Sequence, residues 1–133
     1  MRLINLKETE NQDWISTFDL RFVNSGKEEI ESTTLHSLEH LLIKHFRRVL
    51  GNNYVLLAPM GCRTGFYLCI YGKIDRSHMI LKYKETLEGI LNEQFVPYQT
   101  QVQCGNYLDH DLDKAKFVVS KVIKNFGSIG IVM

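Results

Sequence analysis

The sequence predicts an α+β fold, with an antiparallel β-sheet packed against α-helices in layers, in a single domain over residues 1–133. The first observation behind this prediction is chain length, because 133 residues is a common size for one domain and too short for two. The second is the order of the predicted elements, β-α-β-β-α-β-α, which favours helices on one face of a largely antiparallel sheet.

The first third of the chain predicts a strand followed by a helix. Residues 15–23 (ISTFDLRFV) are rich in β-forming residues and end at a turn cluster, residues 24–27 (NSGK). Thr33 or Thr34 can cap a helix that runs to about Leu50, because apolar residues recur there at spacings of three and four. This helix is therefore expected to be amphipathic.

The middle of the chain predicts two strands on either side of a loop. Residues 51–53 (GNN) end the helix in the manner of a C-terminal cap, and residues 54–58 read as a short strand. Residues 59–65 (PMGCRTG) contain proline and two glycines and are predicted to form a loop. Residues 66–71 (FYLCIY) are almost wholly apolar, which is typical of a central strand.

The last third predicts two helices and a strand. Residues 77 to about 94 place their apolar residues on one side of a helix. Residues 98–104 alternate in part between polar and apolar, so they could form a strand. Asp109 or Asp111 can cap a third helix that runs from residue 112 to about 125.

Charge and cysteine content narrow the classes of function. With 16 Lys and Arg against 15 Asp and Glu, the net charge of +1 gives no electrostatic footprint for nucleic acid or an anionic membrane. The first residues are not expected to form a signal peptide, and no apolar run approaches the roughly 18 residues that span a bilayer. Three cysteines without a secretion signal indicate reduced thiols, so we expect a cytoplasmic protein.

Within the first predicted helix lies an H-x-x-E-H pattern. His36 and His40 are four residues apart, so both imidazoles can face one cation, and Glu39 lies beside them. A carboxylate next to a metal site is placed for general acid–base work. The pattern fits equally a pair of surface histidines beside a glutamate. His45 is turned off this face and is expected to be exposed or capping, and His78 is expected to be solvated.

Two histidines need at least one more ligand to hold a metal ion. Cys104 is a candidate, because it ends a predicted strand next to a glycine, although it fits a buried small apolar residue as well. Cys62, in a loop beside Arg63, is a candidate acid–base or nucleophilic thiolate, or a partly buried spectator. Cys69 is expected in the core.

Four motifs stand in order along the chain. They are residues 18–22 (FDLRF), 36–42 (HSLEHLL), 59–67 (PMGCRTGFY) and 103–105 (QCG). Together they resemble the S-ribosylhomocysteine lyase family, the enzymes of autoinducer-2 synthesis, over residues 18 to about 116.

The resemblance implies a metal site and an acid–base pair. In that family the two histidines of the helix and the cysteine of the Gln-Cys-Gly motif bind one divalent metal, which maps to His36, His40 and Cys104. The metal implied is Fe²⁺, with Zn²⁺ or Co²⁺ as possible substitutes, because such a donor set suits each of them. The family's acid–base groups match Glu39 and Cys62.

The resemblance also implies substrate contacts and an assembly. Arg21 matches the family's substrate-binding arginine, and Asp19 is carried over with it. The family cleaves the thioether of a small molecule, S-ribosylhomocysteine, to homocysteine and 4,5-dihydroxy-2,3-pentanedione. It forms homodimers with active sites at the interface, in a fold of an antiparallel sheet packed on helices.

Two alternatives to this lyase function stay open at the level of sequence. The family carries a histidine in an N-terminal Asp-His-Thr motif, whereas no histidine precedes His36 here. A metal-binding relative of the same fold, with another substrate or without catalysis, would fit this difference. H-x-x-E-H is also the inverted zinc-peptidase motif, but those enzymes use a carboxylate as third ligand, whereas the strongest third donor here is Cys104.

Overall fold

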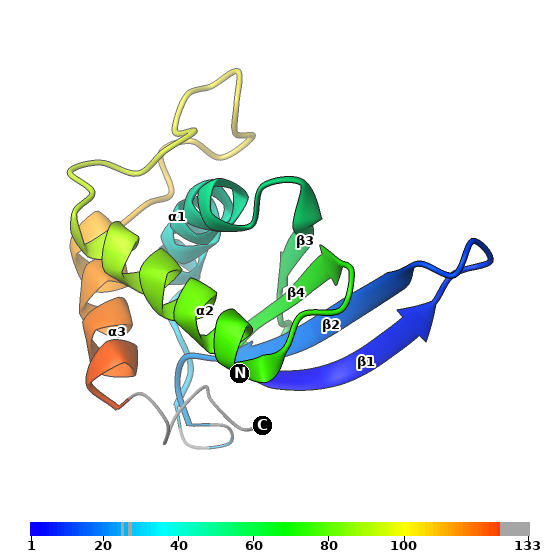
Figure 1. The fold of residues 1–133 in the computed structure, drawn as a ribbon. Helices are drawn as coiled ribbons and strands as arrows, with labels where there is room; N and C mark the ends of the chain where they lie inside the picture. Colours follow the sequence, from blue (N-terminus) through cyan, green and yellow to red (C-terminus); the bar gives the residue numbers. More distant parts are fainter. Residues whose placement is uncertain (25, 27, 126–133) are drawn as a thin grey trace.

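The computed structural model describes residues 1–24, 26 and 28–125 and confirms the predicted fold class, a four-stranded antiparallel sheet with three helices (Figure 1). The strands, in the spatial order β1-β2-β4-β3, are β1 (Arg2–Glu8), β2 (Trp14–Arg21), β3 (Tyr54–Pro59) and β4 (Gly65–Tyr71). The helices are α1 (Ser32–Leu50), α2 (Arg76–Leu91) and α3 (Leu112–Lys124), with a short 3₁₀ helix, η1 (Gly51–Asn53), after α1.

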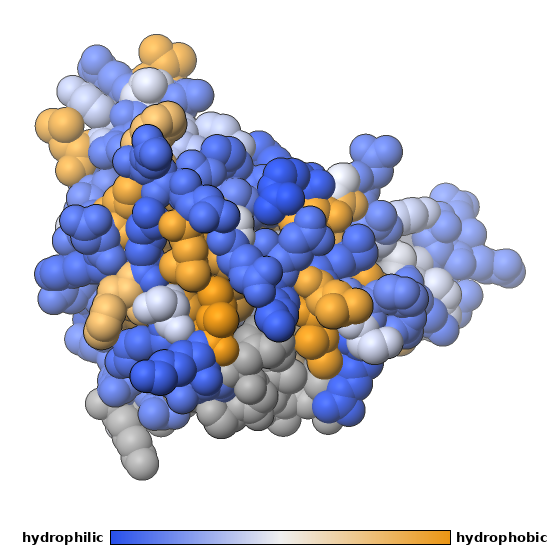
Figure 2. Space-filling model, turned by 60° about the vertical axis from the view of Figure 1, so that its left-hand side comes forward, coloured by the Kyte–Doolittle hydropathy of each residue, from blue (hydrophilic) through white to orange (hydrophobic). Residues whose placement is uncertain are grey.

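The helices gather on one side of the sheet, as predicted (Figure 1). Their apolar sides and the inner face of the sheet share one core, to which α1, α2 and α3 all contribute fully buried residues. The view in Figure 2 shows polar residues over most of the molecular surface on that side. Within the described part of the chain, no helix is long and apolar enough to span a membrane.

Strand β4 is central, as its apolar sequence predicts, and its two faces differ. Phe66, Leu68 and Ile70 are buried against the helices, whereas Tyr67 points to the opposite face and is exposed. Side chains alternate along a strand, so Cys69 lies on the same outer face as Tyr67 and is only half-buried. The prediction of Cys69 as a core residue is therefore wrong.

The N-cap residue predicted for the first helix is also wrong. Glu31, rather than Thr33 or Thr34, occupies the N-cap, and it makes no side-chain cap hydrogen bond. The entry of the helix is set by packing instead. Ile30 is buried, and its backbone N–H donates to the carbonyl of Arg63 at 2.7 Å. By contrast, Asp111 caps α3 as predicted, since its carboxylate accepts the backbone N–H of Lys114.

Residues 98–104 form turns and not the predicted strand. Tyr98 has a φ of 57°, in the left-handed region, which breaks an extended run at its first residue. The backbone N–H of Cys104 donates to the carbonyl of Thr100 at 2.9 Å, and Val102 is 96 % exposed. The partial alternation of polar and apolar residues in this segment therefore does not reflect a strand. Strand β1, which was not predicted, pairs with β2 although all its residues are exposed.

His45 is buried, which contradicts its predicted exposure. Its Nε2 lies 2.9 Å from a Glu93 carboxylate oxygen that also accepts from Lys44 Nζ at 2.6 Å. Burial lowers the pKa of His45. The space for this imidazole comes from Gly89 on α2, where a Cβ would lie 2.6 Å from His45 Nδ1.

His78 is exposed, as predicted, and pairs with Asp75 at the start of α2. Ser25 and Lys27 of the predicted turn lie outside the described residues.

Gly65 gives a test of the sheet. A Cβ at this position would overlap the backbone carbonyl of Leu20 on the paired strand β2, and neither strand can move without disturbing the core. We expect Gly65→Ala to destabilise the fold by about 3 kcal/mol, measured by urea unfolding, because overpacking against backbone has no cheap relaxation. The control is Gly61→Ala, where a Cβ meets no atom within 4 Å. Equal stability of the two variants would contradict this packing.

Candidate active site

Four potential metal ligands come together at one place. Helix α1 presents His36 and His40 one turn apart, and the segment between α2 and α3 supplies Cys104 and His110. One ligand atom from each of the four side chains lies within 4.8 Å of the other three. The three residues predicted as ligands therefore lie side by side, with one more histidine among them.

Backbone carbonyls orient the two histidines of α1. Nδ1 of His36 lies 2.9 Å from the carbonyl oxygen of Asp109, and Nδ1 of His40 lies 2.8 Å from that of Pro97. A carbonyl only accepts, so each Nδ1 carries the proton and each Nε2 keeps a free lone pair. Nε2 of His36 lies 3.3 Å from Sγ of Cys104. This orientation is the one that metal-binding histidines need.

The donor set fits a divalent transition metal. Imidazole nitrogens and a thiolate bind Zn²⁺, Fe²⁺ and Co²⁺, and a tetrahedral site brings a nitrogen and a sulfur ligand to about 3.5 Å of each other. The His36–Cys104 separation of 3.3 Å is close to that value. Among the described residues, the group contains no carboxylate of the kind that the peptidase alternative would need as third ligand.

His110 is the functional candidate that the sequence reasoning missed. Its ring stacks on that of His36 with centroids 4.0 Å apart, and its centroid lies 4.6 Å from that of His40. Burial, together with the two neighbouring histidines, lowers the pKa of His110 to about 4. The sequence feature that could have indicated His110 is its position six residues after Cys104 and directly before the predicted helix cap Asp111.

A second cluster contains the predicted thiol and the predicted substrate-binding residues. Arg21 forms a two-point ion pair with Asp19, at 2.9 Å from Nε and 3.2 Å from Nη2. Its Nη1 donates to Oγ1 of Thr64 at 2.6 Å and lies 3.8 Å from Sγ of Cys62. Thr64 Oγ1 is in turn 2.9 Å from the Cys62 sulfur. Sequence reasoning assigned no role to Thr64, although it stands within the quoted 59–67 motif.

The surroundings of Cys62 favour the thiolate. Hydrogen bonds from Thr64 lower the pKa of the Cys62 thiol, and the Arg21 guanidinium lowers it further. Asp19 raises the pKa of Arg21, so this guanidinium stays charged beside the sulfur. Cys62 is exposed, whereas Asp19 and Thr64 are buried beneath it. The cluster therefore presents an accessible thiol that is activated by the buried side chains beneath it.

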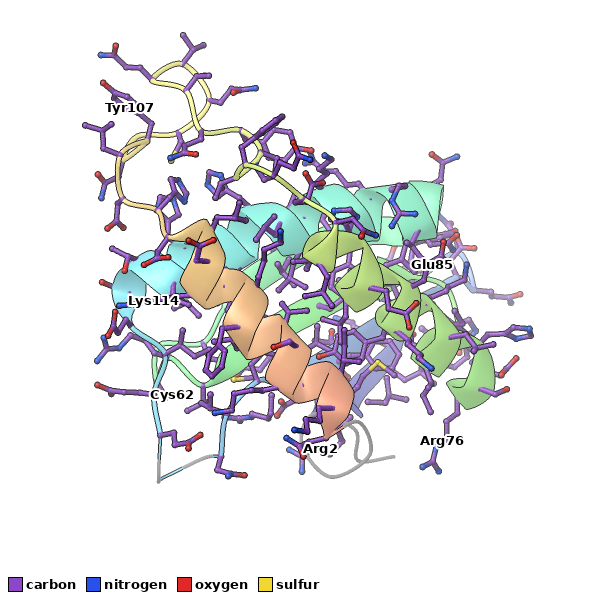
Figure 3. The ribbon with its side chains drawn as sticks, turned by 90° about the vertical axis from the view of Figure 1, so that its left-hand side faces the viewer. Arg2, Cys62, Arg76, Glu85, Tyr107 and Lys114 are labelled. Carbon is purple, nitrogen blue, oxygen red and sulfur yellow. The ribbon has the colours of Figure 1, made fainter. Side chains whose placement is uncertain are left out.

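The two clusters lie on different sides of the chain. Asp19 pairs in register with Tyr67, so Asp19 and Arg21 point to the outer face of the sheet, away from the helices. Figure 3 shows Cys62 and the segment that carries Tyr107 on opposite sides of α1. Glu39 is half-buried on α1 and makes no hydrogen bond or ion pair with any described residue. A single chain thus does not assemble all the predicted site residues.

Comparisons with known proteins agree with these motifs. Residues 1–129 match the family model S-Ribosylhomocysteinase (LuxS). The chain is 37 % identical over 119 residues to an S-ribosylhomocysteine lyase of Clostridioides difficile (strain 630), covering 90 % of this chain and 78 % of the relative. It is 37 % identical over 117 residues to one of Deinococcus radiodurans, covering 87 % of this chain and 73 % of the relative. The chain belongs to the S-ribosylhomocysteinase family.

Proposed function

We propose that the protein is a metal-dependent carbon–sulfur lyase that cleaves the thioether of S-ribosylhomocysteine. The products are homocysteine and 4,5-dihydroxy-2,3-pentanedione, the precursor of autoinducer-2. The observation that carries this proposal is the joint presence of the His36–His40–Cys104 group and the activated Cys62 in a chain of this family. The first is suited to a Lewis-acid metal and the second to proton transfer.

The reaction needs proton transfers beside a carbonyl. Moving the sugar carbonyl along the ribose chain and then eliminating the sulfur each require the loss of a proton from a neighbouring carbon. A divalent metal, proposed as Fe²⁺ with Zn²⁺ or Co²⁺ as substitutes, would be held by His36, His40 and Cys104 and would supply Lewis-acid polarisation of the carbonyl oxygen.

Each predicted acid–base and substrate-binding residue has a role in this proposal. The Cys62 thiolate takes the carbon-bound protons, and its lowered pKa supports that role. Glu39 moves the protons of the sugar hydroxyls, since it is a half-buried carboxylate on α1 next to His36 and His40 in sequence and forms no ion pair with a described residue. Arg21 orients the substrate beside the thiolate, and Asp19 holds Arg21 in place through the two-point ion pair.

A homodimer is part of the proposal. The outer face of the sheet exposes a patch of apolar side chains, Leu56, Tyr67 and Tyr71, around the half-buried Cys69. Exposed apolar surface of this kind is typical of a protein–protein interface. The Cys62 cluster lies toward the same face, away from the metal ligands of its own chain. The proposal requires a second copy whose metal ligands lie close to that cluster.

A cytoplasmic location accompanies this function. All three cysteines are free thiols. Both Cys62 and Cys104 must stay reduced to act as thiolates, which a reducing compartment ensures.

An assay of metal-loaded protein with S-ribosylhomocysteine distinguishes the lyase from the alternative, a metal-binding relative without this activity. Thiol release supports the lyase, and its absence with the metal bound supports the alternative.

Removal of the proposed base gives the first test of the mechanism. We expect Cys62→Ala to lower the rate of homocysteine release by about 10²-fold or more, because general base catalysis is lost. Metal content, measured by atomic emission, stays unchanged since Cys62 is not among the four grouped ligands. Cys69→Ala is the matched control and keeps its activity. Undiminished turnover of Cys62→Ala would exclude Cys62 as the base.

Replacement of Thr64 tests the activation of the thiol. Because Thr64 hydrogen bonds favour the thiolate, Thr64→Val raises the pKa of Cys62 toward its ordinary value. The thiolate fraction at neutral pH then falls. We expect the pH profile of iodoacetamide alkylation at Cys62 to move to higher pH. Thr86→Val, in α2, removes a hydroxyl that donates to the carbonyl of Lys82 in its own helix, and should leave the profile in place. A profile unmoved by Thr64→Val would contradict this account.

Mixed dimers test whether two chains share one site. We expect Cys62→Ala and Cys104→Ala to be inactive alone but to recover about a quarter of wild-type activity when co-expressed. Half of the dimers are then mixed, and each mixed dimer has one site with both residues intact. No recovery would show that each site uses one chain only.

A second pair of variants tests whether the outer face of the sheet is the dimer interface. Leu56→Asp, added to both chains, should abolish the recovery by charging the outer face of the sheet. Leu81→Asp, on α2, should not, although Leu81 is 63 % exposed against 57 % for Leu56. Recovery that survives Leu56→Asp would place the interface elsewhere.

A further inference from the structure

Tyr98 has a backbone conformation that a tyrosine rarely adopts. Its φ of 57° lies in the left-handed region, where a bulky side chain crowds its own backbone. Two other described residues that are not glycine share this conformation. Gln12 lies in the exposed turn between β1 and β2, whereas Arg63 lies beside Cys62. Strained residues of this kind cluster at functional sites, where the surrounding structure holds them in place. The neighbours of Tyr98 should therefore show what its strained position serves.

The chain directly before Tyr98 is fixed against α1. Val96 and Pro97 are buried, and the carbonyl of Pro97 accepts the Nδ1–H of His40 at 2.8 Å. Because the chain is anchored there, the left-handed turn at Tyr98 decides where its phenol ring lies. The centroid of this ring is 6.3 Å from that of His40, and the two planes are tilted by 52°. The strained turn thus holds a half-buried aromatic side chain beside a potential metal ligand.

Tyr98 also borders the surroundings of Glu39. Burial raises the pKa of the Tyr54 phenol, Arg47 opposes this rise, and the Glu39 carboxylate and the Tyr98 phenol both add to it. Glu39 and Tyr98 therefore lie near the same phenol, although one belongs to α1 and the other to the segment between α2 and α3. The hydroxyl of Tyr98 has no hydrogen-bond partner among the described residues. It is available to a bound molecule.

On the basis of the proposed lyase function, which this assignment deepens, we propose that Tyr98 is a substrate-binding residue. Its hydroxyl forms a hydrogen bond with the sugar part of S-ribosylhomocysteine. In the proposed function the metal polarises the sugar carbonyl, so a side chain beside His40 and Glu39 faces the sugar and not the amino-acid end. A phenol both donates and accepts hydrogen bonds, which suits a partner that is itself a hydroxyl.

Removal of the phenol hydroxyl tests this assignment. The readouts are kcat and KM of homocysteine release by the metal-loaded chain of residues 1–133. We expect Tyr98→Phe to raise KM about fivefold and to leave kcat within about twofold, because one substrate hydrogen bond is lost equally from the ground state and the transition state. Tyr107→Phe, at the outer edge of the same segment (Figure 3), keeps the wild-type KM. An unchanged KM in Tyr98→Phe would overturn the proposal.

Two further measurements exclude a merely structural role and locate the contact. Tyr98→Phe should unfold at the wild-type temperature, because the ring and the left-handed turn are kept. Homocysteine lacks the sugar, so its strength as a competitive inhibitor should be the same in Tyr98→Phe and in the wild type. If inhibition by homocysteine weakens by the same factor as KM rises, Tyr98 does not contact the sugar and the proposal is wrong.

Failure of the lyase function is a separate outcome. If the wild type releases no homocysteine, the proposed activity is wrong, and calorimetric titration with S-ribosylhomocysteine decides on Tyr98. Binding that is about fivefold weaker in Tyr98→Phe than in the wild type supports the contact. Equal binding by the two proteins, or no binding by the wild type, overturns it.

Discussion

Burial of the apolar side of α1 is the constraint on which the candidate metal site depends. Leu38, Leu41 and Phe46 are fully buried against the sheet and the other helices, and each such side chain contributes about 2 kcal/mol. Turning the helix about its axis would expose them. The rotation of α1 is thus fixed, and with it the direction in which His36 and His40 point. The segment between α2 and α3 only has to reach this prepared pair.

Alternation along the strands sets the other half of the site. Leu20 is buried in the core, so its neighbours Asp19 and Arg21 must point to the outer face. The loop between β3 and β4 then places Cys62 against Arg21. The same alternation that builds the core therefore separates the thiol from the potential metal ligands of its own chain. The proposed mechanism, which uses both groups, therefore needs a second chain to supply one of them.

Local patterns in the sequence were enough to predict the fold class and the three helices, because these depend on short spacings. The spacing of His36 and His40 and the resemblance of the 103–105 motif were enough to predict that these two histidines and Cys104 lie together. Features set by distant partners were not predictable in this way. The burial of His45 depends on Gly89 of another helix. The pairing of β1 with β2 depends on backbone hydrogen bonds, which require no alternation of polar and apolar residues in the sequence. His110 joins the group only because its segment folds back over α1.

The origin of the ligands has a thermodynamic consequence. Two potential ligands belong to a helix and two to a segment without regular structure, so an ion bound by both would act as a cross-link between ordered and irregular chain. Part of the binding free energy is then spent on restricting that segment. The apparent affinity for the ion consequently reports the order of the backbone as well as the chemistry of the donors. A substitution that loosens the segment would weaken metal retention without touching a ligand.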